Sequence, residues 1–231
     1  MEPYENIMIG NFLYALGLSI GARSRQRKVP ASINLLQQTP LDKLLGDALL
    51  QYPGVVRLLE FKRSKNKSDK ELHKLELLRT AMMPFPHLDP VSRAVHWYIE
   101  SNDDASADAR AVPYLDLAVI DPPRQTTMFS FIDALVEEVV SSGKPPIRDT
   151  LIRQYLECVA SWPGESGAFS GGLLIVVDEQ GRLTYLALDN IRDLCLTHKM
   201  LCELRLERKA PFIPERAHEK TLERAGPTLS R

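Results

Sequence analysis

The succession of apolar and polar positions along the chain predicts a mixture of helices and strands. Apolar residues recur at helical spacing over residues 7–20, 40–52, 68–82, 127–141, 147–161 and 190–207. Runs typical of strands lie at residues 55–61, 94–99, 112–120, 171–177 and 183–188, and the last two flank a turn, which indicates a hairpin. We therefore predict an α+β fold in which a small central mixed sheet is flanked by helices.

The same pattern indicates one domain followed by a tail. Residues 1–208 contain every predicted element and no long linker, so we expect a single mixed domain, with the helices at about 127–161 as an appendage. Residues 209–231 are charged, contain prolines and have few large apolar side chains, a composition typical of a flexible tail.

The first apolar stretch lacks the features of a membrane span or an export signal. It is shorter than the roughly 20 apolar residues that cross a bilayer, and the basic cluster at residues 23–28 follows it instead of preceding it. We therefore expect a cytoplasmic protein with no membrane contact. The three cysteines include no Cys-x-x-Cys pair, which excludes a disulfide scaffold and a zinc ribbon.

Charge is balanced over the whole chain but divided unevenly along it. The 29 basic and 30 acidic residues leave a net charge of -1. Residues 1–80 hold 13 basic and 8 acidic side chains, whereas residues 81–189 hold 7 and 16. A basic beginning and an acidic middle indicate either separate surfaces for separate partners or a dipolar surface that binds nothing.

One short motif has the composition of a catalytic site. Glu60-Phe61-Lys62 ends the predicted strand 55–61, and the period of two in a strand places Glu60 and Lys62 on the same face. Asp47 precedes Glu60 by thirteen residues, and a lysine-rich helix follows. This arrangement resembles the PD-(D/E)XK nuclease superfamily, whose signature is an acidic residue followed by Asp/Glu-x-Lys in a strand.

The resemblance implies a Mg²⁺-dependent nuclease that hydrolyses DNA. Asp47 and Glu60 would hold the ion, because Mg²⁺ prefers carboxylate oxygens, and Lys62 would position or activate the attacking water. The basic side chains near the motif would then hold phosphates through charge; these are Arg57, Arg63, Lys65 and Lys67.

The chain departs from the family pattern at its first acid. The family places this acid on a strand paired with the Glu-x-Lys strand, after a further strand and a helix, whereas Asp47 falls in the predicted helix 40–52 and follows Gly46 instead of proline. Glu5 is another candidate for an acid contributed by the first helix. Asp116, in the predicted strand 112–120, could supply a missing ligand. Either the site is rearranged or the fold has lost its metal.

A second hypothesis comes from a different class of protein. Asp/Glu-x-Lys occurs again at Glu207-Arg208-Lys209, so the tripeptide also arises by chance, and Glu60 with Lys62 then makes an ordinary charge pair at a strand end. In that case the acidic segment 100–121 would bind a protein partner, as in an immunity or adaptor protein, because acidic surfaces steer basic partners.

Overall fold

The computed structural model describes ten stretches of the chain. They are residues 4–25, 27–36, 46–64, 69–102, 108–141, 147–160, 172–188, 193, 195–196 and 198–209. The predicted tail, apart from Lys209, and the predicted phosphate contacts Lys65 and Lys67 lie outside these stretches. No helix within them is both long enough and apolar enough to span a bilayer.

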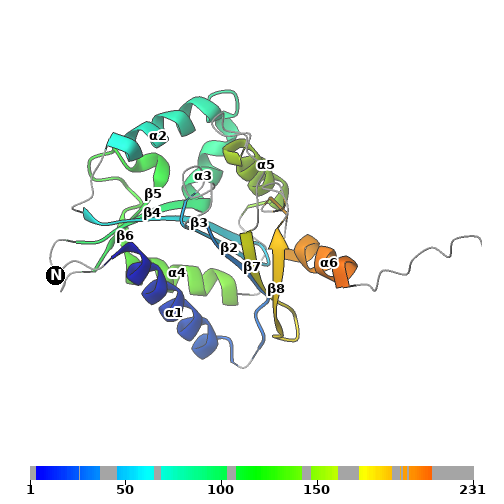
Figure 1. Cartoon of the computed structure of the whole chain (residues 1–231). Helices are drawn as coiled ribbons and strands as arrows, with labels where there is room; N and C mark the ends of the chain where they lie inside the picture. Colours follow the sequence, from blue (N-terminus) through cyan, green and yellow to red (C-terminus); the bar gives the residue numbers. More distant parts are fainter. Residues whose placement is uncertain are drawn as a thin grey trace, which may run out of the picture.

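Eight strands form one mixed sheet across the molecule (Figure 1). Their bounds are β1 Ala31–Leu35, β2 Ala48–Tyr52, β3 Val55–Lys62, β4 His96–Glu100, β5 Arg110–Pro113, β6 Thr126–Thr127, β7 Gly172–Val177 and β8 Leu183–Leu188. The order across the sheet is β6-β5-β4-β3-β2-β1-β7-β8, and every neighbouring pair is antiparallel except β3 with β4. The predicted α+β class is confirmed, with a sheet larger than the small one expected.

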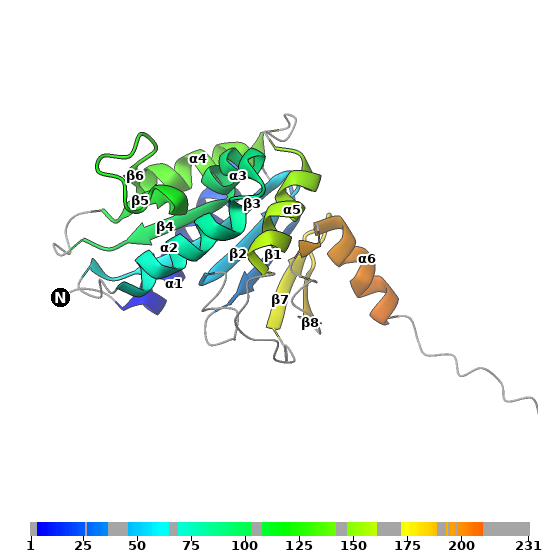
Figure 2. The same cartoon turned by 90° about the horizontal axis from the view of Figure 1, so that it is seen from above.

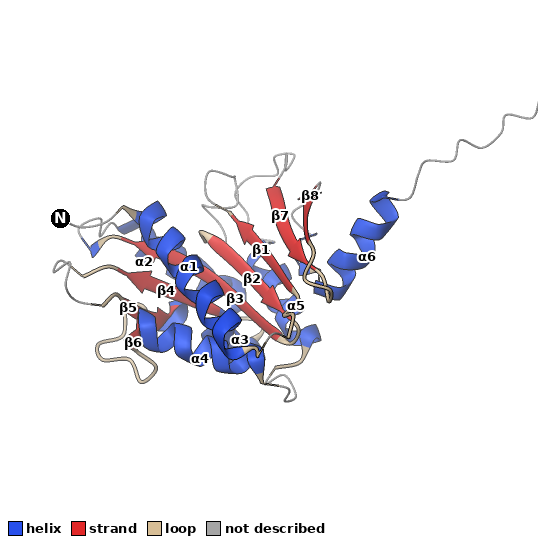
Figure 3. Ribbon diagram, turned by 90° about the horizontal axis from the view of Figure 1, so that it is seen from below, coloured by secondary structure: helices blue, strands red, loops and turns tan. Residues whose placement is uncertain are grey.

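Helices cover both faces of this sheet. They are α1 Glu5–Arg23, α2 Asp69–Met82, α3 Asp89–Val95, α4 Met128–Val140, α5 Asp149–Ala160 and α6 His198–Lys209, with short 3-10 helices η2 Pro86–Leu88 and η3 Tyr114–Asp116. Helices α2, α3 and α5 lie over one face (Figure 2), and α1 and α4 cross the other (Figure 3). The helices predicted at 127–161 are therefore separated by the sheet, and each packs into a different core.

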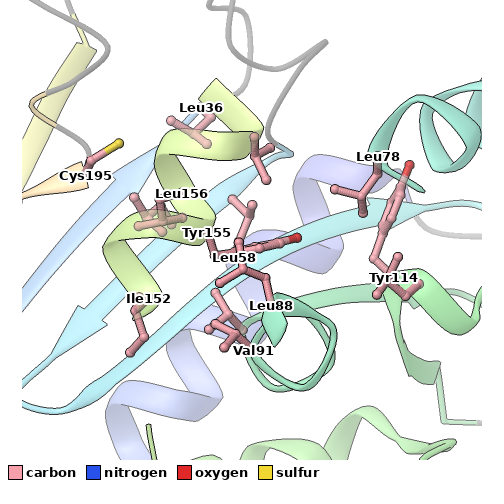
Figure 4. Packing of buried hydrophobic residues seen from close by; sticks show 14 of the residues in the cluster. Leu36, Leu58, Leu78, Leu88, Val91, Tyr114, Ile152, Tyr155, Leu156 and Cys195 are labelled. Carbon is pink, nitrogen blue, oxygen red and sulfur yellow. The ribbon is translucent and has the colours of Figure 1, made fainter. Parts of the chain in front are cut away.

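Two hydrophobic clusters fill the space between the sheet and its helices. One contains Leu58, Leu78, Tyr114 and Tyr155 and joins α2, α3 and α5 to the sheet (Figure 4). The other lies under α1 and α4, where the Phe12 ring packs edge-on against Phe61 with centroids 5.5 Å apart. Because both faces of the central strands are buried, β2 and β3 lie deep in the molecule.

The helix predicted at 40–52 is wrong where the structure can be compared with it. Ala48–Tyr52 form β2, and all five residues are buried. An apolar run that is buried on both faces has no alternation, so its sequence does not distinguish a helix from a central strand. Residues 37–45 lie outside the described stretches.

Three further differences concern the strands. The strand expected at 112–120 is β5, which ends at Pro113, and the chain then turns through η3. β1 has no counterpart among the predicted strands, because Ser32 and Asn34 occupy buried positions and interrupt the apolar pattern. The strand predicted at 94–99 begins later, at His96, because Ala94 still belongs to α3.

Candidate functional site

Neighbouring ends of β2 and β3 bring together two buried carboxylates. Asp47 lies immediately before β2, and the pairing of Ala48 with Leu59 places it beside Glu60 of β3. The Asp47 N–H donates to the Leu59 carbonyl at 2.8 Å, and Asp47 Oδ2 accepts the Phe61 N–H at 2.6 Å. The exposed fractions of Asp47 and Glu60 are 3% and 1%. Antiparallel pairing therefore unites two acids that are distant in the sequence.

Gly46 gives the chain the shape that this approach requires. Its φ is +132°, a conformation that residues with a side chain rarely adopt. A Cβ atom at this position would lie 2.8 Å from the Leu59 carbonyl oxygen and 3.4 Å from Glu60 Oε2. The glycine therefore keeps open the space beside the second oxygen of Glu60.

Two lysines share the other oxygen of Glu60. Oε1 lies 3.1 Å from Lys62 Nζ and 3.2 Å from Lys74 Nζ, which comes from α2. The same two ammonium groups lie 3.6 Å and 4.0 Å from Glu71 Oε1. Two carboxylates and two ammonium groups thus alternate in a compact cluster between β3 and α2, which we call the Glu60–Lys62 cluster.

A tyrosine hydroxyl hydrogen-bonds to the second carboxylate of this cluster, Glu71. Tyr114, in η3, donates its O–H to Glu71 Oε2 at 2.9 Å. Burial raises the pKa of Tyr114 well above its usual range, and the nearby carboxylates of Glu71 and Glu60 raise it further. The hydroxyl therefore remains protonated and acts as a hydrogen-bond donor.

Burial sets the charge balance of the cluster. It raises the pKa of Glu60 to about 7, with the negative charges of Asp47 and Glu71 adding to the rise and the positive charges of Lys74 and Lys62 opposing it. Burial lowers the pKa of Lys62, but Glu60, Glu71 and Glu5 raise it more, so it lies above its usual value. Lys62 is therefore a cation at neutral pH, while Glu60 can exchange its proton.

The donor set suits a hard divalent cation bound by few protein ligands. Asp47 and Glu60 approach from adjacent strands, and Gly46 leaves space beside Glu60 Oε2. Mg²⁺ commonly uses one or two carboxylates and completes its shell with water and substrate phosphate. In the described part of the chain, no group of three or more His, Cys, Asp or Glu side chains is arranged to hold a metal. By donor chemistry, Asp47 and Glu60 would supply two oxygen ligands to an ion of this kind.

The structure does not bring Arg57 or Asp116 into the Glu60–Lys62 cluster. Arg57 belongs to the other set of alternating β3 side chains, and its guanidinium pairs with Glu138 of α4 at 2.7 Å. Asp116 lies in η3 instead of a strand, and its Oδ1 accepts from Arg93 Nε at 2.9 Å. Both side chains contribute ion pairs between elements of the fold.

Arg63 and Glu5 do lie next to the cluster. The Arg63 guanidinium carbon is 5.1 Å from the centre of the Tyr4 ring, and Tyr4 directly precedes α1. The charge of Glu5, in the first turn of α1, contributes to the raised pKa of Lys62. The start of α1 therefore meets the end of β3.

The acidic segment 100–121 uses several of its carboxylates within the fold. Glu100 lies 3.5 Å from Arg110 as an ion pair, and Asp108 Oδ2 accepts the Phe129 N–H at the beginning of α4. Asp116 pairs with Arg93 as described above. Asp121 is exposed, and residues 103–107 lie outside the described stretches. These internal contacts leave fewer described charges for a partner than the sequence indicates.

Sequence reasoning did not select Glu71, Lys74 and Tyr114 as site residues. Glu71 and Lys74 are three residues apart on α2 and so share a face, but charged side chains around most of this helix obscure which face is buried. Tyr114 lies in a segment that reads as a strand. The available signal was Glu71 at a helical spacing from the buried Leu75 and Leu78, on the side that faces the sheet.

A separate pocket of about 500 Å³ lies at the opposite end of β3. The turn between β2 and β3, helices α5 and α6, and the turn between β7 and β8 contribute to its walls. His198 lies in it with Nδ1 2.7 Å from Ser32 Oγ, and its rim carries both signs of charge, including Asp149 and Lys199. This mixture favours no single class of ligand.

A scan against protein-family models and searches of curated proteins and of solved structures found no match to this chain.

Proposed function

We propose that this protein is a Mg²⁺-dependent nuclease that hydrolyses phosphodiester bonds of DNA. The observation that supports this most directly is the geometry at the end of β3. Asp47 and Glu60 lie side by side on adjacent strands, and Lys62 Nζ is 3.1 Å from Glu60 Oε1. Two acids and a cation are the groups that the PD-(D/E)XK resemblance requires.

The order of elements around these residues adds support. Helix α1 and strand β1 precede Asp47, which lies immediately before β2, the strand paired with β3. Helix α2 follows, and β4 then pairs with β3 in parallel. The departure inferred from the sequence, an acid located in a helix, is therefore absent from the fold, while Gly46 still stands where the family pattern has proline.

The chain's own groups supply positioning and charge in this proposal. A Mg²⁺ ion held by Asp47 and Glu60 would lower the pKa of water and neutralise negative charge on the phosphate. Lys62 keeps its proton at neutral pH, so it orients the attacking water and stabilises developing negative charge instead of removing a proton. Lys74 holds the same oxygen of Glu60 from the opposite element, α2, and fixes its rotamer.

The test is cleavage of DNA by the full chain in the presence and absence of Mg²⁺. We expect Glu60→Gln and Asp47→Asn to lower the cleavage rate at least about a hundredfold, because each removes one of two charged ligands. Glu76→Gln is the matched control, since this glutamate is exposed on α2 and lies outside the cluster. Its rate should equal that of the parent.

Calorimetry with Mg²⁺ and with Mn²⁺ separates loss of the metal from loss of the fold. The parent and Glu76→Gln should bind the ion, whereas Glu60→Gln should bind it weakly while keeping a cooperative unfolding transition. Cleavage by Glu60→Gln at the parental rate would refute the proposal, as would Mg²⁺-independent cleavage.

A further inference from the structure

An aromatic ring and a guanidinium group form a pair at the edge of the candidate site. The Tyr4 ring is 65% exposed, and the Arg63 guanidinium carbon lies 5.1 Å from its centroid. The two residues are distant in the sequence, so only the fold brings them together. Arg63 and aromatic side chains both bind the faces of nucleobases, the first through cation–π contact and the second by stacking.

The backbone holds Tyr4 firmly, although its side chain faces solvent. Its carbonyl oxygen accepts the N–H groups of Ile7 at 3.0 Å and Met8 at 3.1 Å, so it begins α1. Met8 and Phe12 anchor the same helix in the core beneath the sheet. An exposed ring on a fixed backbone loses little conformational entropy when a ligand stacks on it.

Arg63 is held in the same way from the other side. The Lys62 carbonyl accepts the Ser101 N–H at 2.9 Å, and the Ser64 N–H donates to Ser101 Oγ at 3.3 Å. Arg63 lies between these two contacts. The ends of β3 and β4 therefore hold the backbone of Arg63 in place, and its guanidinium lies over the Tyr4 ring.

The pair lies next to the Glu60–Lys62 cluster but on the other side of the strand end. Arg63 follows Lys62, and Tyr4 precedes Glu5, whose charge acts on the Lys62 ammonium. The Lys62 ammonium contacts Glu71 of α2, whereas the Arg63 guanidinium lies over Tyr4 at the start of α1. A base stacked at Tyr4 would therefore lie at the same end of β3 as the Glu60–Lys62 cluster.

Only a base outside a duplex can stack on the Tyr4 ring and the Arg63 guanidinium. In a duplex the faces of the bases are covered by their neighbours in the stack, and a protein contacts their edges and the phosphates. In a single strand the faces are accessible, and stacking on an aromatic ring is tolerant of sequence. An exposed ring beside a phosphate-cleaving site thus favours single-stranded DNA.

We propose that Tyr4 and Arg63 form a stacking site for an unpaired base, so that the substrate is DNA with a single-stranded stretch at the Glu60–Lys62 cluster. This inference rests on the proposed nuclease function for the identity of the ligand. The Tyr4–Arg63 pair indicates the class of substrate, whereas the carboxylates of Asp47 and Glu60 do not distinguish single-stranded from double-stranded DNA.

The test measures binding without cleavage. Fluorescence anisotropy in EDTA compares a short fluorescein-labelled oligothymidylate with a blunt DNA duplex as probes for the full chain. We expect Tyr4→Ala to weaken binding of the single strand about tenfold, the usual effect of losing one stacking contact, and Arg63→Gln to weaken it as well. Binding of the duplex should change little, and Tyr4→Phe should bind like the parent because the ring is retained.

Tyr14→Ala is the matched control, because Tyr14 is 72% exposed on the same helix, and it should bind the single strand like the parent. Equal binding by the parent and Tyr4→Ala, or an equal loss in Tyr14→Ala, would overturn the inference. Cleavage assays distinguish this failure from that of the proposed function. If Glu60→Gln loses cleavage but Tyr4→Ala binds the single strand like the parent, only the stacking site is refuted. If Tyr4→Ala weakens single-strand binding but the parent cleaves no DNA, only the proposed nuclease function is refuted.

Discussion

At the scale of single residues, Gly46 shows how closely the site depends on one backbone conformation. Its φ of +132° and the 2.8 Å approach to the Leu59 carbonyl leave no place for a side chain. We predict that Gly46→Ala lowers the free energy of unfolding by about 1 to 3 kcal/mol and weakens Mg²⁺ binding, because Asp47 must move away from Glu60. Urea unfolding and calorimetry measure the two effects.

Gly17 provides the contrast for that experiment. It lies in α1, and a Cβ there would have nothing within 4 Å. Gly17→Ala should therefore stabilise the protein by up to about 1 kcal/mol, since alanine favours the helix. If Gly46→Ala left stability and Mg²⁺ binding unchanged, the role assigned to Gly46 would be wrong.

His96 makes a prediction about pH. It is buried, its Nδ1 lies 2.8 Å from the Tyr155 hydroxyl, and that hydroxyl accepts from Ser92 Oγ. Tyr155 therefore donates to Nδ1 of a neutral imidazole whose ring stacks on Tyr114, with centroids 4.4 Å apart. Burial, and then the positive charge of Lys74, lower the pKa of His96 to about 3.

The unfolded chain takes up the proton that the folded chain excludes. Below the ordinary histidine pKa of about 6.5, protonation of His96 in the unfolded chain lowers the free energy of the unfolded state relative to the folded state. The stability that neutral His96 contributes is therefore complete above pH 6.5 and is lost as the pH falls toward 3. Between pH 7 and pH 5 this residue should remove about 2 kcal/mol from the free energy of unfolding. His96→Phe should be less stable at pH 7 but should lack this dependence.

The exposed His87 in η2 is the control for that measurement. Urea unfolding at the two pH values should give His87→Gln the same pH dependence as the parent. A parental dependence in His96→Phe would show that another group is responsible.

At this scale the sequence allowed part of the site to be predicted. Glu60 and Lys62 could be predicted because the period of two in an apolar strand places their side chains on the same face. Their closeness to Asp47 depends on the register of β2 against β3, which spacing alone does not determine. Arg57 was assigned to the site by proximity along the chain, although it belongs to the opposite face of its strand.

At the scale of elements, the contact of η3 with α2 is made through Tyr114 and Glu71. Tyr114→Phe keeps the packed ring but removes the O–H that Glu71 Oε2 accepts. A buried acceptor without its donor costs about 1 to 3 kcal/mol, so we predict a loss of stability of that size. Tyr185→Phe, at a 68% exposed position in β8, should stay within about 0.5 kcal/mol of the parent in the same urea titration. Equal stability of the two variants would contradict this role for the hydroxyl.

Helices with one apolar face were the elements that the sequence predicted well. α4 and α5 bury one side each and match the predicted ranges closely. β2 is buried on both sides, so it lacks the alternation by which a strand is recognised. β1 has the opposite difficulty, since its buried Ser32 and Asn34 are polar. Whether a polar side chain is buried depends on the tertiary packing around it, which the local sequence pattern does not contain.

At the scale of the whole molecule, the α+β class followed from the mixture of periods, but the extent of the sheet did not. The hairpin of β7 and β8 was predicted, yet its pairing with β1 joins segments from opposite ends of the described chain. No local pattern encodes such a partner. For the same reason, the sequence did not predict that α4 and α5 pack on opposite faces of the sheet.

That long-range pairing sets the order in which the sheet can assemble. Strands β1 to β6 come from residues 31–127, and most of their pairings close short loops, whereas Ala31 meets Val177 only after most of the chain has been made. The entropy of loop closure rises with loop length, so the β7–β8 hairpin should add last and detach first. The Glu60–Lys62 cluster lies in the earlier part. We therefore expect the β7–β8 hairpin to open before the strands that carry the cluster.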